Sequence, residues 1–188
     1  MTQYARPDAT LSTDTDSNAA PWQDQAGGAN LHLAIDETSA DGDTTHIHIT
    51  DDGNDEECVV GLSNVSAPGS SGTYIKYTAI TADDSEAGAP GLRFELLEDG
   101  DSIDPAVTTT NNSVSTSSYT AYASSSLDVS GVSDWNDLSL KITMISNTGS
   151  GDAMKVTQAY LEVPDAGGGG GSDAVPVSLN TYRQMREH

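Results

Sequence analysis

The sequence is poor in cysteine, in aromatic residues and in positive charge. It contains one cysteine among 188 residues, so neither a disulfide within the chain nor a zinc site built on cysteines can form. Only 7 lysine and arginine residues are present, and they are scattered, whereas phosphate binding needs them clustered. No apolar run approaches the roughly 18 residues of a membrane span. These absences predict that neither nucleic acid nor a membrane is a partner.

Acidic residues supply most of the charge. Aspartate and glutamate number 29, which gives the chain a net charge of -22. Such a chain repels itself in dilute buffer, but in about 1 M salt the screening length falls to about 3 Å and most of the repulsion disappears. The composition therefore predicts a halophilic or marine environment, in which a strongly hydrated acidic surface resists salting out.

From residue 31 onward, apolar residues alternate with polar ones, which is the period of a half-buried β-strand. Turn sequences such as Asp52-Gly53 and Pro68-Gly69 separate the alternating segments. Eight or nine short strands of this kind predict an all-β fold, an antiparallel β-sandwich with a jelly-roll topology. The residues expected to face inward are Leu31/Leu33/Ile35, Ile47/Ile49, Cys58/Val60/Leu62, Ile75/Tyr77/Ala79, Leu92/Phe94/Leu96 and Leu138/Leu140/Ile142/Met144.

The last strand changes its apolar parity between Val156 and Ala159. One inserted residue would explain the change, so we predict a β-bulge near Thr157-Gln158.

Four segments are predicted along the chain. Residues 1–30 lack periodicity and are expected, if ordered, to lie as an extended N-terminal arm across the domain or a neighbouring subunit, anchored by Trp22. Residues 31–164 form the β-sandwich. A glycine-rich linker at 165–173 leads to a basic C-terminal tail at 174–188, which is expected to dock on an acidic neighbour such as a second copy. The predicted docking residues are Trp22, Leu179, Tyr182, Arg183, Met185 and Arg186.

Several short motifs occur in a fixed order between about residues 4 and 164. The series is Arg6-Pro7-Asp8, Trp22, Leu33-Ala34-Ile35-Asp36-Glu37, His46-Ile47, Val60-Gly61-Leu62-Ser63, Pro68-Gly69-Ser70, Tyr74-Ile75-Lys76-Tyr77, Leu92-Arg93-Phe94-Glu95-Leu96-Leu97 and Asp134-Trp135-Asn136-Asp137-Leu138. In this order the sequence resembles a family of small structural proteins of tailed bacterial and archaeal viruses. The resemblance implies a virion protein with a jelly roll similar to carbohydrate-binding modules. Because the first eight residues have no apolar stretch typical of a signal peptide, we expect assembly in the host cytoplasm.

Few residue clusters favour metal binding or catalysis. His46 and His48 alternate on one strand and could share a metal with Asp43 or Asp51, but an exposed strand face explains them more simply. The acidic turns at 41–43, 51–57 and 99–101 lack the spacing of an EF-hand. No Gly-x-Ser-x-Gly motif is present, and Cys58 is expected to be buried and inert. We therefore expect no metal site, no cofactor and no enzymatic activity.

Exposed aromatic rings would be needed for binding to sugar. Tyr74, Tyr119 and Tyr122 are the candidates, whereas Trp135 is expected to close one end of the sandwich.

The outward-facing lysines and arginines of the body are expected to pair with nearby acids. These are Lys76, Arg93, Lys141 and Lys155.

The sequence favours a virion structural protein of a halophilic tailed virus. A capsid decoration or turret subunit on the particle exterior would hold neighbouring subunits together through many weak contacts. A tail or baseplate component is one alternative, and a module that attaches the particle to host glycan is another. The expected partners are major capsid or tail proteins and copies of the chain, with a host surface glycan in the last case. A small hydrolase would need a convergent acid pair in a cleft.

Deletion of residues 173–188 should leave the sandwich folded but weaken assembly, because the tail carries the predicted docking residues. Circular dichroism and occupancy in purified particles measure the two effects. Full occupancy of the truncated chain would contradict the docking hypothesis.

Overall fold

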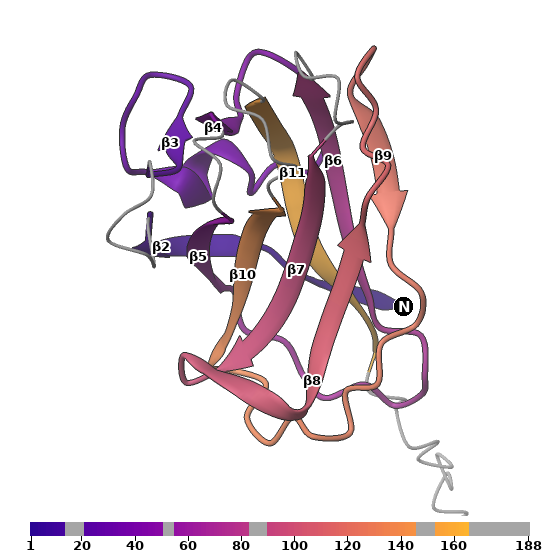
Figure 1. Cartoon of the computed structure of the whole chain (residues 1–188). Coiled ribbons are helices and arrows are strands. Elements are labelled where there is room, and N and C mark those ends of the chain that lie inside the picture. Colours follow the sequence, from indigo (N-terminus) through magenta and orange to yellow (C-terminus); the bar gives the residue numbers. More distant parts are fainter. Residues whose placement is uncertain (14–20, 51–54, 83–89, 146–152, 166–188) are drawn as a thin grey trace, which may run out of the picture.

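Two antiparallel β-sheets packed face to face form the structure, a computed structural model that describes residues 1–13, 21–50, 55–82, 90–145 and 153–165 (Figure 1). Sheet A has the strand order β3-β4-β11-β6-β9, with β1 also paired to β11, and sheet B has the order β2-β5-β10-β7-β8. The predicted all-β antiparallel sandwich is confirmed. The strands are β1 (Thr2–Ala5), β2 (Pro7–Ser12), β3 (Gln23–Asp24), β4 (Ile47–Thr50), β5 (Glu56–Leu62), β6 (Tyr74–Ala82), β7 (Gly91–Glu98), β8 (Asp101–Asn111), β9 (Thr120–Ala123), β10 (Leu138–Ile145) and β11 (Ala153–Pro164).

The core lies between the sheets and is built from alternate residues of each strand. In β7, for example, Leu92, Phe94 and Leu96 are fully buried, whereas Arg93 and Glu95 between them are partly exposed. Burial of one such apolar side chain contributes about 1.5–3 kcal/mol to stability. The predicted inward residues of β5, β6 and β10 are also buried and so confirmed, including Cys58, although residues between them such as Val59 and Thr143 are buried as well.

The predicted β-bulge is present in β11. The register between β11 and β6 shifts between Val156 and Gln158, which allows both Val156 and Ala159 to face the core. Thr157 and Gln158, the two residues between them, bind the loop that precedes β4. Thr157 donates its hydroxyl to the Thr45 carbonyl at 2.8 Å, and Gln158 donates its amide to the Glu37 carbonyl at 2.7 Å. The bulge therefore joins residues 37–45 to the centre of sheet A.

Residues 31–35 do not form the predicted strand. They contain a short 3-10 helix, η1 (Leu31–Ala34), in which Leu31 and Ala34 are buried and Leu33 is 60% exposed. The reason is geometric, because side chains three residues apart share one face of a 3-10 turn. His32 lies against β2, where its Nδ1 is 3.0 Å from the Thr10 hydroxyl.

The described part of residues 1–30 is built into both sheets. β1 pairs with β11 in sheet A, and β2 pairs with β5 in sheet B. Trp22 is fully buried in the core of its own chain and donates its ring N–H to the Glu56 carbonyl at 3.1 Å. Of the two positions expected for the Trp22 anchor, its own domain or a neighbouring subunit, the structure has the first, because the ring anchors the N-terminal segment to its own domain.

Beyond residue 30, two strands at sheet edges are missing from the sequence-based prediction. β8 forms one edge of sheet B and buries only Ile103 and Val107 among its apolar residues, and β9 forms one edge of sheet A. Trp135, which is expected to close one end of the sandwich, is buried in the core. The glycine-rich linker beyond Asp165 and the basic tail, with Leu179, Tyr182, Arg183, Met185 and Arg186, lie outside the described residues. Within the described residues, the structure contains no helix of the length and apolar character needed to cross a membrane.

Trp22→Ala should lower the free energy of unfolding by about 3–5 kcal/mol, because it leaves a large cavity in the core and removes a buried hydrogen bond. Chemical denaturation in molar salt measures the change. Leu33→Ala is the control, and since Leu33 is exposed its effect should stay within about 0.5 kcal/mol. Equal effects of the two substitutions would contradict the burial of Trp22.

Candidate functional site

Three tyrosines project from neighbouring strands on the outer face of sheet A. Tyr4 of β1 and Tyr74 of β6 are both paired with Glu162 of β11, one from each side, and Tyr160 of β11 is paired with Lys76 of β6. Paired residues of adjacent strands share a face of the sheet, so these side chains project together, away from the core. We call this set of five residues the tyrosine face.

The tyrosine face is partly open to solvent and fixed by contacts among its members. The rings of Tyr4 and Tyr160 lie edge to face with their centroids 5.7 Å apart, and Tyr4 is 48% exposed. Such aromatic pairs contribute about 0.5–1.5 kcal/mol beyond their burial. Lys76 Nζ lies 2.7 Å from Glu162 Oε2, and this hydrogen bond raises the pKa of Lys76. At neutral pH the face therefore presents aromatic rings around one ion pair.

Arg6, in the link between β1 and β2, borders the tyrosine face. Its guanidinium carbon lies 4.9 Å from the ring centroid of Tyr160 and 5.6 Å from that of Tyr4. Its Nη1 donates hydrogen bonds to the backbone carbonyls of Asp36 and Glu37. These hydrogen bonds hold the guanidinium beside the two rings, within the distance at which cation-π attraction acts.

A pocket of about 180 Å³, lined by both apolar and charged residues, lies farther along β6 and β11. Asp43 Oδ1 accepts hydrogen bonds from the Tyr119 hydroxyl at 2.7 Å and from Lys155 Nζ at 3.0 Å. These two bonds, with that from Tyr119 the stronger, hold the pKa of Asp43 below its ordinary value, and burial together with Asp43 raises the pKa of Tyr119. The pocket is lined by Asp43, Ile80, Thr81, Thr116, Tyr119, Ala153 and Lys155.

The pocket and the tyrosine face lie on one surface. Tyr74 and Ile80 both project outward from β6, and six residues of strand span about 20 Å. Beside them, Ala121 and Ala123 of β9 are exposed and carry only methyl side chains. The outer face of sheet A therefore has aromatic rings at one end, a pocket with charged residues at the other and only small side chains along β9.

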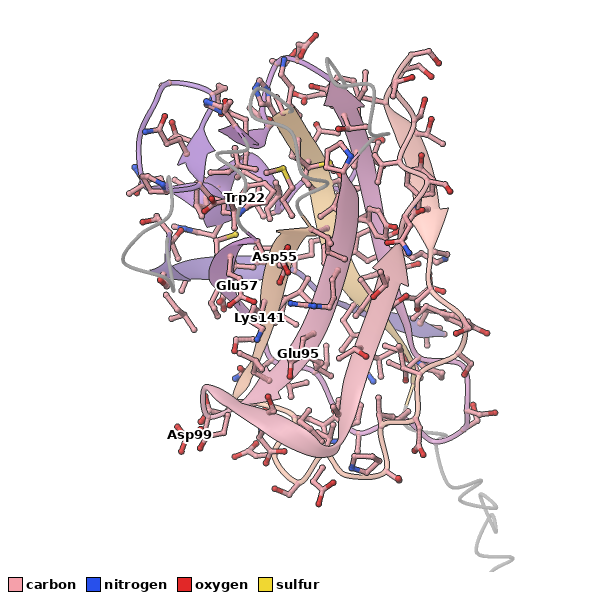
Figure 2. All side chains as sticks on the ribbon, viewed as in Figure 1. Trp22, Asp55, Glu57, Glu95, Asp99 and Lys141 are labelled. Carbon is pink, nitrogen blue, oxygen red and sulfur yellow. The ribbon has the colours of Figure 1, made fainter. Side chains whose placement is uncertain are left out.

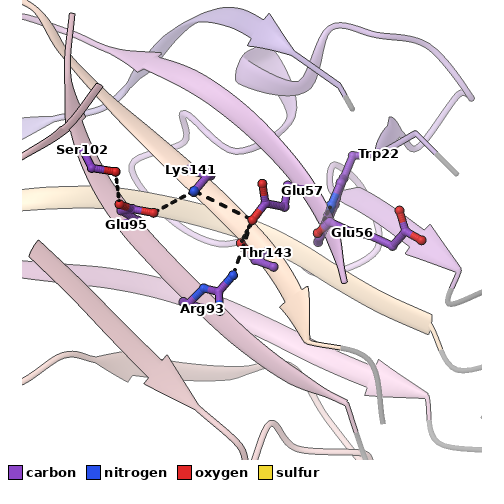
Figure 3. Close-up of polar contacts among 8 residues, drawn as sticks. All are labelled: Trp22, Glu56, Glu57, Arg93, Glu95, Ser102, Lys141 and Thr143. Carbon is purple, nitrogen blue, oxygen red and sulfur yellow. Dashed lines mark hydrogen bonds and ion pairs between the residues drawn. The ribbon is translucent and has the colours of Figure 1, made fainter. Parts of the chain in front are cut away.

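The outer face of sheet B is different, because it is crossed by a balanced ionic network (Figure 2). Lys141 of β10 lies between two acids, with its Nζ 2.7 Å from Glu95 Oε2 and 3.8 Å from Glu57 Oε1, and Arg93 lies 3.4 Å from Glu57 (Figure 3). The outward residues of β5, β7 and β10 include no aromatic side chain. Such a network of ion pairs is typical of residues that stabilise a fold.

The predicted pairing of the body's cations with local acids is confirmed. Lys76, Arg93, Lys141 and Lys155 each lie within 4.0 Å of a carboxylate oxygen. Burial alone would raise the pKa of Glu95, but hydrogen bonds from Lys141 and Ser102 outweigh it and the pKa is lowered. The network therefore holds Glu95 in its charged form.

The histidine pair, His46 and His48, lies at the end of sheet A opposite the tyrosine face. Ile47 and Ile49 pack inward as expected, but His46 is 8% exposed, which corrects the expectation of an exposed strand face. The rings of His46 and His48 lie 5.6 Å apart, and burial lowers the pKa of His46. Across the described ranges, no group of three or more histidine, cysteine or acidic side chains is arranged to hold a metal ion.

Of the sugar-binding candidates taken from the sequence, Tyr74 alone belongs to the tyrosine face. Tyr122 stacks on Tyr77 at 5.2 Å, and Tyr119 lines the pocket. Tyr4 and Tyr160 were not singled out by sequence reasoning. The outward parity of Tyr160 is readable once the bulge is located, but the pairing of β1 with β11 joins residues about 160 positions apart and leaves no local signal.

Lys141→Met should lower the free energy of unfolding by about 1–3 kcal/mol at pH 7, because it leaves two partly buried carboxylates without their shared partner. Since the folded pKa of Glu95 lies below its ordinary value of 4.5, its stabilising contribution is present above that value and is lost as pH falls through the folded pKa. The difference between wild type and variant should therefore shrink at pH 3.

Chemical denaturation at the two pH values measures this. Arg93→Met is the matched control and should cost less, because Arg93 makes one longer contact and is 35% exposed. A difference for Lys141→Met that is the same at both pH values would contradict the proposed charge coupling.

No protein-family model and no curated protein matches the sequence. Among solved structures, the fold is similar to TmCBM61 in complex with β-1,4-galactotriose, with a TM-score of 0.41 and 8% identity over 80% of this chain and 98% of that chain. It is also similar to the enzymatically active domain of bacteriophage CBA120 tailspike protein 4, with a TM-score of 0.42 and 9% identity over 86% of this chain and 19% of that chain. At these identities the likeness concerns β-sandwich architecture, and the ligand named there belongs to that protein.

Proposed function

We propose that this chain is a glycan-binding β-sandwich module and that the outer face of sheet A is its binding surface. The observation that supports the proposal is the tyrosine face, where three tyrosines from three neighbouring strands surround one Lys–Glu ion pair and Tyr4 is 48% exposed. Tyrosine is well suited to this role, because it offers a large rigid ring with a polar end at a low cost in conformational entropy.

The ion pair supplies the directional contacts that rings lack. Lys76 offers ammonium N–H donors and Glu162 offers carboxylate acceptors, and hydrogen bonds to charged groups are stronger than neutral ones. Sugar hydroxyls can both donate and accept, so a pyranose lying on the rings would satisfy both partners. The pocket around Asp43 and Lys155, about 20 Å along the same sheet, would bind a further unit of an extended ligand.

The proposed setting is a tailed-virus particle of a halophilic host, where the module would attach the particle to host surface glycan by binding alone, without catalysis. The sequence resemblance to virion structural proteins supports this setting. Capsid decoration, turret, and tail or baseplate are then proposed positions for the module on the particle, held by other virion proteins and by further copies of the chain. Repetition on a particle would raise weak single-site affinity by multivalency.

Tyr160→Ala and Tyr4→Ala should each weaken glycan binding by about 10-fold or more, which corresponds to about 1.4 kcal/mol. Binding of the whole chain to a panel of immobilised neutral and acidic polysaccharides in 1 M NaCl measures the effect. Leu11→Ala is the matched control, because Leu11 is a 59% exposed apolar side chain on sheet B, and it should leave binding unchanged.

Absence of binding to every polysaccharide of the panel would overturn the proposal. So would unchanged binding by both tyrosine variants when their thermal unfolding matches that of the wild type.

A further inference from the structure

Arg6 differs from the other cations in the described part of the chain. Lys76, Arg93, Lys141 and Lys155 each have a carboxylate partner, whereas no carboxylate of the described residues lies within 4.0 Å of Arg6. The chain has 29 acidic residues and 7 basic ones, so local pairing would be the ordinary outcome. Arg6 is thus a positive charge that the surrounding acidic surface does not neutralise.

The carboxylates of the neighbouring acids form no ion pair with the guanidinium within the described residues. Asp36 and Glu37 bind Arg6 only through their backbone carbonyls, and the Glu37 carboxylate instead accepts the hydroxyl of Thr45. Glu162, the acid of the tyrosine face, is paired with Lys76. The positive charge of Arg6 is therefore retained beside the rings.

The guanidinium is held in place while part of it stays available. Its Nη1 is bound to the two carbonyls, and its central carbon lies 4.9 Å from the ring centroid of Tyr160 and 5.6 Å from that of Tyr4. Within the described ranges, no hydrogen-bond acceptor contacts Arg6 Nε or Nη2. These N–H groups form a fixed fork, the geometry that binds a carboxylate through two parallel hydrogen bonds.

We propose that the tyrosine face selects an anionic glycan, in which a sugar ring packs against the exposed side chain of Tyr4 beside Tyr160 and a carboxylate or sulfate group on that sugar binds Arg6. This inference rests on the proposed glycan-binding function and adds the charge of the ligand. Long-range repulsion between the net charge of -22 and a polyanion is screened in molar salt, whereas a direct two-bond contact persists.

The test compares polymers that differ only in charge. Polygalacturonate is paired with its fully methyl-esterified form, and dextran sulfate with dextran, so that the sugar stays constant while the anionic group changes. Binding of the whole chain to each polymer is measured in 1 M NaCl. Wild type should prefer the charged member of at least one pair by about 10-fold or more, and the pair concerned identifies the anion as carboxylate or sulfate.

The Arg6→Gln variant should lose this preference, and Arg6→Lys should keep only part of it, because a lysine retains the charge without the fork. The ratio of charged to neutral binding is the readout, since any effect of the variant on the two rings changes both members of a pair. Arg93→Gln is the control and should keep the wild-type ratio, because Arg93 lies on sheet B and is paired with Glu57.

Two results would overturn the inference alone, namely equal wild-type binding to charged and neutral members of both pairs, or a wild-type preference that Arg6→Gln retains. In either case, loss of binding in Tyr160→Ala would leave the proposed function standing. A wild type that binds no polysaccharide of any kind would overturn both.

Discussion

The pairing of β11 with three other strands is the constraint on which both the core and the tyrosine face depend. β11 pairs with β6 along one edge and with β4 and β1 along the other. Without the bulge after Val156, a shift of one residue would turn either the first or the second half of this strand inside out. The bulge keeps Val156 and Leu161 in the core and directs Lys155 and Tyr160 outward.

The two outer faces use the scarce positive charges in different ways. On sheet B, Arg93 and Lys141 are paired with Glu57 and Glu95 in one connected network. On sheet A, cations are placed among aromatic rings and beside a pocket, where polar ligand groups can reach them. The large negative charge of the chain therefore does not set the local chemistry of either face.

The sequence predicted those features that depend on local pattern. Alternation identified the inward residues of β5, β6, β7 and β10, the change of parity located the bulge, and outward position identified the cations that form ion pairs. The error at Leu31–Ala34 arose because a run of five residues fits a strand and a helical turn equally well. β8 and β9 were missed because edge strands bury few apolar residues. Tyr4 and Tyr160 are joined by strand pairing across most of the chain, which no local pattern encodes.

The N-terminal segment links folding to the candidate site. It crosses from sheet A to sheet B at Arg6, so that Tyr4 lies on the tyrosine face while Pro7 is paired with β5. Trp22 is buried between the sheets and holds the same segment on the core. Because Tyr4 and Arg6 both belong to this segment, the rings and the guanidinium come together only when β1 is paired with β11. The segment, expected to lie across its own domain or a neighbouring subunit, lies in its own domain and supplies two of the six side chains from which a ligand surface could be built.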